Sequence, residues 1–387
     1  MSSVGLISIP VELLVNVASN LDGEDFRNFR LVNKRLAAIS LHQIAKNGIS
    51  LLNTAGDLKQ LQKILTCTEI ARNVKQLKFL HSEWPMAFSR REWETHPLFV
   101  AGNDRGQDVL PDEADKAFEA YSLFENTERK RIHSEDVDRL KSILISLPNL
   151  QSLFICHMQH CVWKPSLNTR YNNLIKRIWM SPYLGDDISP GLVFLLLALG
   201  SDFPNINKLE INGSLNPEFM VETFFKPTDI KPLALLTQIR VLHVDSFRVI
   251  QNENSIIKFL EAFPNVSNAS IKFQGWGPAI SIIGTVKWTN IGDLQLSGLW
   301  TSEEEIFQTF QNHHKTLKSF TLRSSALTEG SWRSLFTRIR GLNSGVQVIG
   351  EGELYGRTRR ETLNLHLPTI STSLVKFIED HTVDWPF

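Results

Sequence analysis

Residues 265–271 read NVSNASI, residues 290–296 read NIGDLQL and residues 316–322 read TLKSFTL. Each segment places a turn residue before the pattern apolar-x-x-apolar-x-apolar. The same pattern begins at residues 73, 149, 205, 238 and 342, and from residue 238 onward it returns every 25 to 27 residues. Alternation of apolar and polar residues predicts a short strand with one buried face. The sequence therefore predicts eight short strands built from one repeating unit.

Helical patterns fill the segments before several of these strands. Residues 137–147, 254–263, 302–313 and 331–342 carry apolar residues at helical spacing, and Ser302 with Glu305 has the spacing of a capping box. Short strands that alternate with helices predict an α/β fold with a parallel sheet and right-handed crossovers. Because the unit is so short, we expect a solenoid with parallel strands on its concave face and helices on its convex face.

The repeats resemble irregular leucine-rich repeats, whose period is about 20–29 residues. Members of that family usually place an Asn after the third apolar position. Asn212 is the best match here, and most other repeats lack it. An ordinary α/β domain whose units are similar by chance is the alternative.

Residues 82–136 do not fit the repeat. They contain many charged residues and two glycines, which favours a polar insertion that is helical near residues 114–124. The run Arg129-Lys130-Arg131 is basic enough for a nuclear signal. Glu128 and Glu135 flank the run, so a solvated helix of mixed charge is the favoured interpretation.

Residues 6–40 read LISIPVELLVNVASNLDGEDFRNFRLVNKRLAAIS and predict three short helices. Ser8 is a suitable N-cap and Pro10 suits a first helical turn. Three helices of this size cannot close a full core without help from a partner or an attached domain. Burial of an aliphatic side chain is worth roughly 1.5–3 kcal/mol, so the apolar residues at the start of the chain favour docking against something.

The same segment resembles an F-box. Ile9-Pro10-x-Glu12-Leu13-Leu14 follows that family's Leu-Pro-x-Glu-Ile-Leu pattern, and Leu31-Val32 with Lys34-Arg35 follows its later part. The chain departs from the pattern at Ile9, at Asn33 in place of Cys and at Leu36 in place of Trp. The resemblance implies a three-helix unit that binds a Skp-type adaptor and, through it, a cullin. It assigns adaptor binding to Leu6, Ile9, Pro10, Leu13, Leu14, Val17, Leu31 and Val32. An amphipathic helical hairpin is the alternative.

These resemblances imply three parts: an F-box in residues 1–45, a leucine-rich-repeat-like domain in residues 46–375 and a C-terminal tail in residues 376–387. Fungal F-box proteins carry repeats of this irregular kind. The implied function is that of a non-catalytic substrate receptor in a Skp–cullin–F-box ubiquitin ligase. A ubiquitin-independent scaffold bound to the adaptor, or an unrelated binding solenoid, remains open.

Strand alternation also predicts which side chains face a target protein. Residues that point away from the core lie on the concave face. We expect this face to include Phe154, Glu210, His243, Asp245, Gln295 and Arg323. The set has mixed charge, so it indicates neither an acidic nor a phosphorylated target.

Composition excludes several classes of protein. The chain of 387 residues has 41 basic and 41 acidic residues, and a protein that holds nucleic acid through phosphates usually has a basic excess. Three cysteines are too few for a disulfide framework, and the N-terminal residues lack the features of a signal peptide. The longest apolar run, residues 191–200, is too short for a bilayer span and predicts a buried helix. We therefore expect a cytoplasmic or nuclear protein that binds neither membrane nor nucleic acid.

Local motifs give little support for catalysis or cofactors. Cys156-His157-Met158-Gln159-His160-Cys161 contains four possible zinc ligands, but structural zinc sites usually combine two separated pairs. The glycines at 350, 352 and 356 do not have the spacing of a dinucleotide-binding loop, and Glu351 and Glu353 would repel a pyrophosphate. We expect no metal, no cofactor and no catalytic residue.

Overall fold

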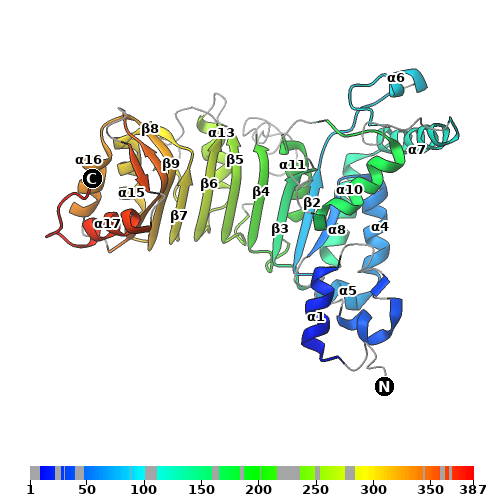
Figure 1. The fold of residues 1–387 in the computed structure, drawn as a ribbon, viewed down its shortest axis with the longest axis horizontal. Helices are drawn as coiled ribbons and strands as arrows, with labels where there is room; N and C mark the ends of the chain where they lie inside the picture. The colour runs from blue at the N-terminus through cyan, green and yellow to red at the C-terminus, as the bar shows by residue number, and fades with distance from the viewer. Residues whose placement is uncertain are drawn as a thin grey trace, which may run out of the picture. The chain divides into compact units, whose positions relative to one another are not determined.

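The computed structural model divides the chain into two compact units. Unit 1 comprises Met1–Asp186 and Phe194–Leu199, and unit 2 comprises Asp187–Val193 and Gly200–Phe387. Both units combine helices with mostly parallel strands (Figure 1). The structure describes residues 9–21, 28–29, 31–39, 48–87, 89–100, 111–158, 165–183, 187–200, 202–215, 236–248, 253–274, 284–342, 345–357, 362–365 and 368–387.

Three parallel strands form the sheet of unit 1. The strands β1 (Ile49–Leu52), β2 (Gln76–His81) and β3 (Ser152–His157) pair in that order. The helices α4 (Ala55–Leu65) and α5 (Thr68–Asn73) form the crossover between β1 and β2, since parallel strands cannot be joined by a tight turn. The predicted strands β2 and β3 are thus confirmed, whereas β1 was not predicted.

The segment between β2 and β3, which was expected to be a polar insertion, also contributes buried apolar side chains. It contains α6 (Arg90–Glu94), α7 (Pro111–Arg129) and α8 (His133–Ile145), and α7 includes the predicted helical residues. Trp93 of α6 and Tyr121 of α7 are almost completely buried. They share one hydrophobic core with side chains of β2 and β3 and of α10 (Pro165–Ile178). Although α7 is rich in charged residues, one side of the helix carries apolar side chains that pack in this core.

The N-terminal helices have a small core of their own. It lies between α1 (Val11–Asn20) and the helical residues 34–39, and its buried members are Leu14, Ala18, Phe29, Leu36 and Ile39. Leu36, which stands where an F-box usually has Trp, is fully buried. Asn33 accepts a hydrogen bond from Leu36 N at 2.9 Å and so caps the last helix. The expected N-cap Ser8 lies outside the described residues.

Six parallel strands in chain order form the main sheet of unit 2. They are β4 (Lys208–Leu215), β5 (Val241–Arg248), β6 (Asn268–Gln274), β7 (Asp293–Ser297), β9 (Ser319–Glu329) and β10 (Gln347–Tyr355). All six were predicted. Two short strands were not: β8 (Trp300–Ser302) pairs with β9, and β11 (Leu363–Leu365) pairs antiparallel with β10.

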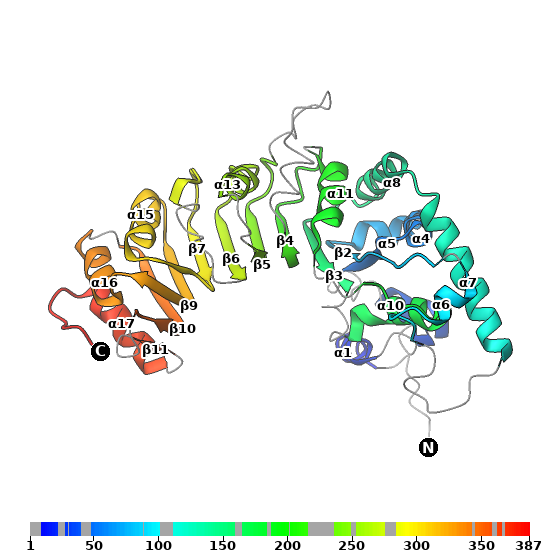
Figure 2. The ribbon, with the colours of Figure 1, turned by 90° about the horizontal axis from the view of Figure 1, so that it is seen from above.

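The predicted helices of unit 2 are also present. The helices α13 (Glu253–Glu261) and α15 (Glu303–His313) lie on the same side of the strands (Figure 2), and α16 (Trp332–Gly341) is the third predicted helix. The helix α17 (Pro368–Glu379) was not predicted. The capping box of α15 is confirmed, since Glu305 N donates to Ser302 Oγ at 3.2 Å and Ser302 N donates to Glu305 Oε2 at 3.0 Å. The helix α15 therefore begins directly after Ser302, as predicted.

The longest apolar run forms α11 (Ser189–Leu199), and its Leu192, Leu195 and Leu199 side chains are fully buried, as predicted. Within the described ranges, no helix has both the length and the apolar character needed to cross a membrane.

The C-terminal residues and the register of β10 differ from expectation. Residue 376 lies inside α17, and Trp385 packs against Phe336 and Phe377, so residues 376–387 are not a separate tail. The pattern at residue 342 places Gln347 level with Thr321, but the structure pairs Ile349 with Thr321. The apolar pattern could not show this register. Gly350 takes an inward position normally held by an apolar side chain, and Leu365 and Leu374 fill its space.

Candidate functional site

Five exposed aliphatic side chains belong to the N-terminal helical unit. We call Val11, Leu13, Val17, Leu31 and Val32 the apolar surface. Between 42% (Val11) and 78% (Leu31) of each residue is exposed. Single exposed aliphatic residues are normal in proteins, but five of them within 22 residues of sequence are candidates for contact with a partner. The F-box resemblance assigns four of these residues, Leu13, Val17, Leu31 and Val32, to adaptor binding. Val11 was not assigned because it stands at a variable position of the motif.

The other residues assigned to adaptor binding lie elsewhere. Pro10 is exposed and is the N-cap residue of α1, whereas Ile9 is half-buried and packs against the small core. Leu14 is fully buried inside that core, so it cannot contact a partner directly. Consecutive residues of a helix differ by about 100° in direction, which separates buried Leu14 from exposed Leu13. Leu6 lies outside the described residues.

The second candidate surface is one face of the unit 2 sheet. Along β6 and β7 every second residue is buried, and the residues between them are exposed or half-buried. Parallel sheets usually have both faces covered, and their strands then read as continuous apolar runs. Here the outward residues form rows across the strands. One row pairs Glu210, His243, Ser270, Gln295, Thr321 and Ile349 in register. We call these outward residues the polar sheet face.

Three pairs of oppositely charged residues lie on the polar sheet face. Lys208 Nζ lies 2.7 Å from Glu210 Oε1, and Lys272 Nζ lies 3.2 Å from Asp245 Oδ1. Arg323 Nε lies 3.9 Å from Glu351 Oε2. Burial lowers the pKa of His243, and the charge of Lys208 lowers it further, against the opposite effect of Glu210. His243 therefore favours its neutral form, whereas other outward positions of these strands carry both signs of charge.

Five of the six residues expected to face a target lie on the polar sheet face: Glu210, His243, Asp245, Gln295 and Arg323. Phe154 does not. It lies in unit 1, where only 9% of it is exposed, and it belongs to the core that includes Tyr171 and Leu174 of α10. The expectation failed for Phe154 because side chains of α6, α7 and α10 pack against this part of the sheet in unit 1. The strand pattern gives no information about that packing.

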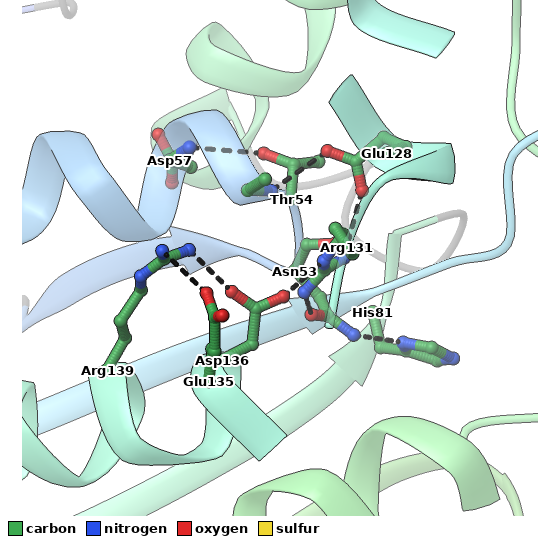
Figure 3. Close-up of polar contacts among 10 residues, drawn as sticks. Asn53, Thr54, Asp57, His81, Glu128, Arg131, Glu135, Asp136 and Arg139 are labelled. Carbon is green, nitrogen blue, oxygen red and sulfur yellow. Dashed lines mark hydrogen bonds and ion pairs between the residues drawn. The ribbon is translucent and has the colours of Figure 1, made fainter. Parts of the chain in front are cut away.

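Unit 1 also contains a buried polar network that the sequence did not reveal (Figure 3). Arg131 is its centre. Its guanidinium lies 2.6 Å from Asp136 Oδ2 and 2.9 Å from Glu128 Oε2, and it donates to Asn53 O at 3.0 Å. Glu128 Oε1 in turn accepts a hydrogen bond from Ala55 N, at the start of α4. The basic run that resembled a solvated helix is thus partly a buried ionic link between α7, α8 and β1.

The network fixes the tautomer of a buried histidine. Arg131 donates to Asn53 Oδ1 at 2.9 Å, so the Asn53 amide nitrogen faces His81 and donates to Nδ1 at 2.9 Å. Neutral His81 therefore carries its proton on Nε2, which has no hydrogen-bond partner in the described part of the chain. Burial, together with the charges of His157 and Arg131, lowers the pKa of His81 to about 3. His81 is neutral over the physiological pH range.

The reactive side chains near His81 are buried away from solvent. Ser82 Oγ lies 3.1 Å from His157 Nε2, which resembles a nucleophile and its base, but both residues are at least 95% buried. Cys156 donates its thiol hydrogen to the His157 carbonyl oxygen. The described residues contain no cluster of three potential metal ligands, and Gln159, His160 and Cys161 lie outside them.

Neither a scan against protein-family models nor a search of curated proteins gives a match for this chain. The apolar surface and the polar sheet face are the candidate functional features of the described residues.

Proposed function

We propose that this protein is an F-box substrate receptor of a Skp–cullin–F-box ubiquitin ligase. In this proposal the N-terminal helical unit is the F-box, and the strands and helices that follow form an irregular leucine-rich-repeat solenoid. The observation that carries the proposal is the apolar surface, because the residues that resemble the F-box motif include exposed Leu13, Val17, Leu31 and Val32. The proposed location is the cytoplasm or nucleus.

The energetics of the apolar surface support a protein partner. Each of its aliphatic side chains would gain roughly 1.5–3 kcal/mol on full burial, and five such gains exceed what scattered surface residues offer. The small core of Leu14, Leu36 and Ile39 holds the helices together from within. The exposed residues are therefore available for a Skp-type adaptor without loss of the fold.

The polar sheet face is the proposed site for the target. A parallel sheet with one open face fits a solenoid, in which helices cover the other face. Exposed, evenly spaced side chains on a rigid sheet provide an extended binding surface. The receptor would hold target and adaptor at once, and the resulting proximity would raise the effective concentration of a target lysine near the ubiquitin-charged enzyme. No catalytic residue is required of this chain.

Capture of a purified Skp-type adaptor by the full-length chain tests the proposal. Leu13→Arg with Val32→Arg should abolish capture, because both substitutions place charge in the buried interface. Leu123→Arg is the matched control, since Leu123 is 69% exposed on α7 and lies outside the apolar surface. Equal capture by wild type and the double variant would refute adaptor binding through this surface.

Two further outcomes separate the alternatives. If the chain retains the adaptor but never brings down a cullin, it is a ubiquitin-independent scaffold. If the wild type does not retain the adaptor, it is an unrelated binding solenoid. For the second surface, Gln295→Arg with Thr321→Arg should reduce target capture while adaptor capture stays unchanged.

A further inference from the structure

We infer that Arg35 is a positioning residue for adaptor binding: it fixes the start of α1 relative to the helix of residues 34–39, and so holds the two parts of the apolar surface in one arrangement. The inference rests on the proposed function. One part of the surface, Val11, Leu13 and Val17, lies on α1, and the other part, Leu31 and Val32, directly precedes the helix of residues 34–39.

The bond that carries the inference joins these two segments. Arg35 Nη2 donates a hydrogen bond to Ile9 O at 3.0 Å, across 26 residues of sequence. The guanidinium is charged and half-buried, which makes such a bond stronger than one between neutral groups. Ile9 immediately precedes the N-cap residue of α1, so Arg35 holds the chain at the point where the helix begins.

No N-cap side chain fixes the start of α1. The N-cap residue is Pro10, which makes no side-chain hydrogen bond, although its carbonyl accepts from Leu14 N at 3.1 Å. Proline fixes its own φ but cannot fix the direction of the preceding residue through a side-chain bond. The hydrogen bond from Arg35 to Ile9 ties the entry of α1 to the last helix of the unit.

Two other features hold that last helix in place. Leu36 and Ile39 bury their side chains in the small core, and Asn33 caps the helix N-terminus. Loss of the Arg35 bond would leave the core and the cap intact. The fold should therefore persist while α1 gains freedom relative to Leu31 and Val32, and binding must then supply the free energy needed to order it.

Arg35→Met keeps the length and apolar character of the stem but removes the donor. We expect it to weaken adaptor binding about tenfold, the equivalent of about 1.4 kcal/mol, with little change in thermal unfolding. Arg35→Lys, which keeps a cationic donor, should recover part of the affinity. Arg240→Met is the matched control, because Arg240 also donates to a backbone carbonyl, Asn265 O at 3.1 Å, but belongs to unit 2.

A double-mutant cycle with Leu13→Ala distinguishes positioning from a general loss of stability. If Arg35 orients Leu13, the Leu13→Ala substitution should reduce affinity less in the Arg35→Met protein than in the wild type. Additive effects, or wild-type affinity in Arg35→Met, would overturn the inference. The proposed function fails separately, if the wild type does not bind purified adaptor at all.

Amide hydrogen exchange tests positioning without any partner. Loss of the Arg35 bond should accelerate exchange at the Leu14 amide, which closes the first turn of α1, by about tenfold, and leave the Leu36 amide near its wild-type rate. Unchanged exchange at Leu14 would contradict the positioning role even if no adaptor is available.

Discussion

Arg131 Nε lies 2.6 Å from Asp136 Oδ2, and the two side chains are only 13% and 1% exposed. The same guanidinium contacts Glu128 and reaches back across 78 residues to the carbonyl and side-chain oxygens of Asn53. A charge buried at this depth persists only when it is paired and hydrogen-bonded. The pair therefore fixes the segment between α7 and α8 to the end of β1.

Arg131→Met should strongly destabilise unit 1. It removes the cation that buried Asp136 and Glu128 share, although Arg139 still contacts Asp136 Oδ1 at 3.0 Å. Breaking a buried pair in this way costs about 3–5 kcal/mol. Urea denaturation followed by tryptophan fluorescence measures the loss. Arg90→Met is the control, because Arg90 pairs with Glu94 at 2.8 Å but is exposed, so no measurable change is expected. Equal stability of the two variants would contradict the structural role of Arg131.

Acid should destabilise unit 1 through His81. Its folded pKa of about 3 lies below the value of 6.5 for the unfolded chain, so folding favours the neutral imidazole. The free energy of unfolding is therefore unaffected by His81 above pH 6.5. It falls as the pH decreases from 6.5 towards 3, by up to about 1.4 kcal/mol per pH unit, because only the unfolded chain takes up the proton.

His81→Asn keeps an acceptor for Asn53 but does not titrate, so stability measured from pH 7 to pH 4 should decline less steeply than in the wild type. Glu128, whose pKa is raised by burial, contributes to both curves, and the difference between the curves isolates His81. Parallel curves would show that His81 is not the sensitive group.

Gly330→Ala should destabilise unit 2. Gly330 has φ +83°, a conformation that side chains other than glycine rarely adopt, and an added Cβ would collide with the Glu303 side chain. Glu303 accepts hydrogen bonds from Ser331 N at 2.9 Å and Ser334 Oγ at 2.7 Å, at the start of α16. We expect a loss of about 1–3 kcal/mol. Gly341→Ala is the control, since nothing lies within 4 Å of its added Cβ. A thermal midpoint that falls equally in both variants would be inconsistent with this account.

Gly350→Ala should overpack the end of the unit 2 sheet. Its new Cβ would collide with Leu365 and lie 3.1 Å from Leu374 Cδ2, which predicts a cost of about 1–3 kcal/mol. Leu365→Ala removes the obstructing atoms, so Gly350→Ala should cost much less in that background. Denaturant titration of the two single variants and the double variant measures the coupling. Strict additivity would mean that Leu365 does not fill the space beside Gly350.

The strands and helix starts of unit 2 could be predicted because their signals are local. Alternating residues such as Leu294 and Leu296 define a strand within six residues, and Ser302 with Glu305 marks a helix start within four. The register of β10 could not be predicted in this way. Gly350 occupies an apolar position, and the side chains that fill its space come from β11 and α17.

The candidate surfaces likewise combine features that are local in the sequence with features that depend on tertiary contacts. The sequence by itself determined the period of the strands, the position of the N-terminal motif and the polar character of the outward strand positions, because each depends on residues close together in the chain. Only the tertiary structure decided that Leu13 is exposed while Leu14 is buried, that α10 covers Phe154, and that Arg131 joins Asn53 and Asp136. The physical reason is that burial and ion pairing depend on distant segments that meet only when the chain folds.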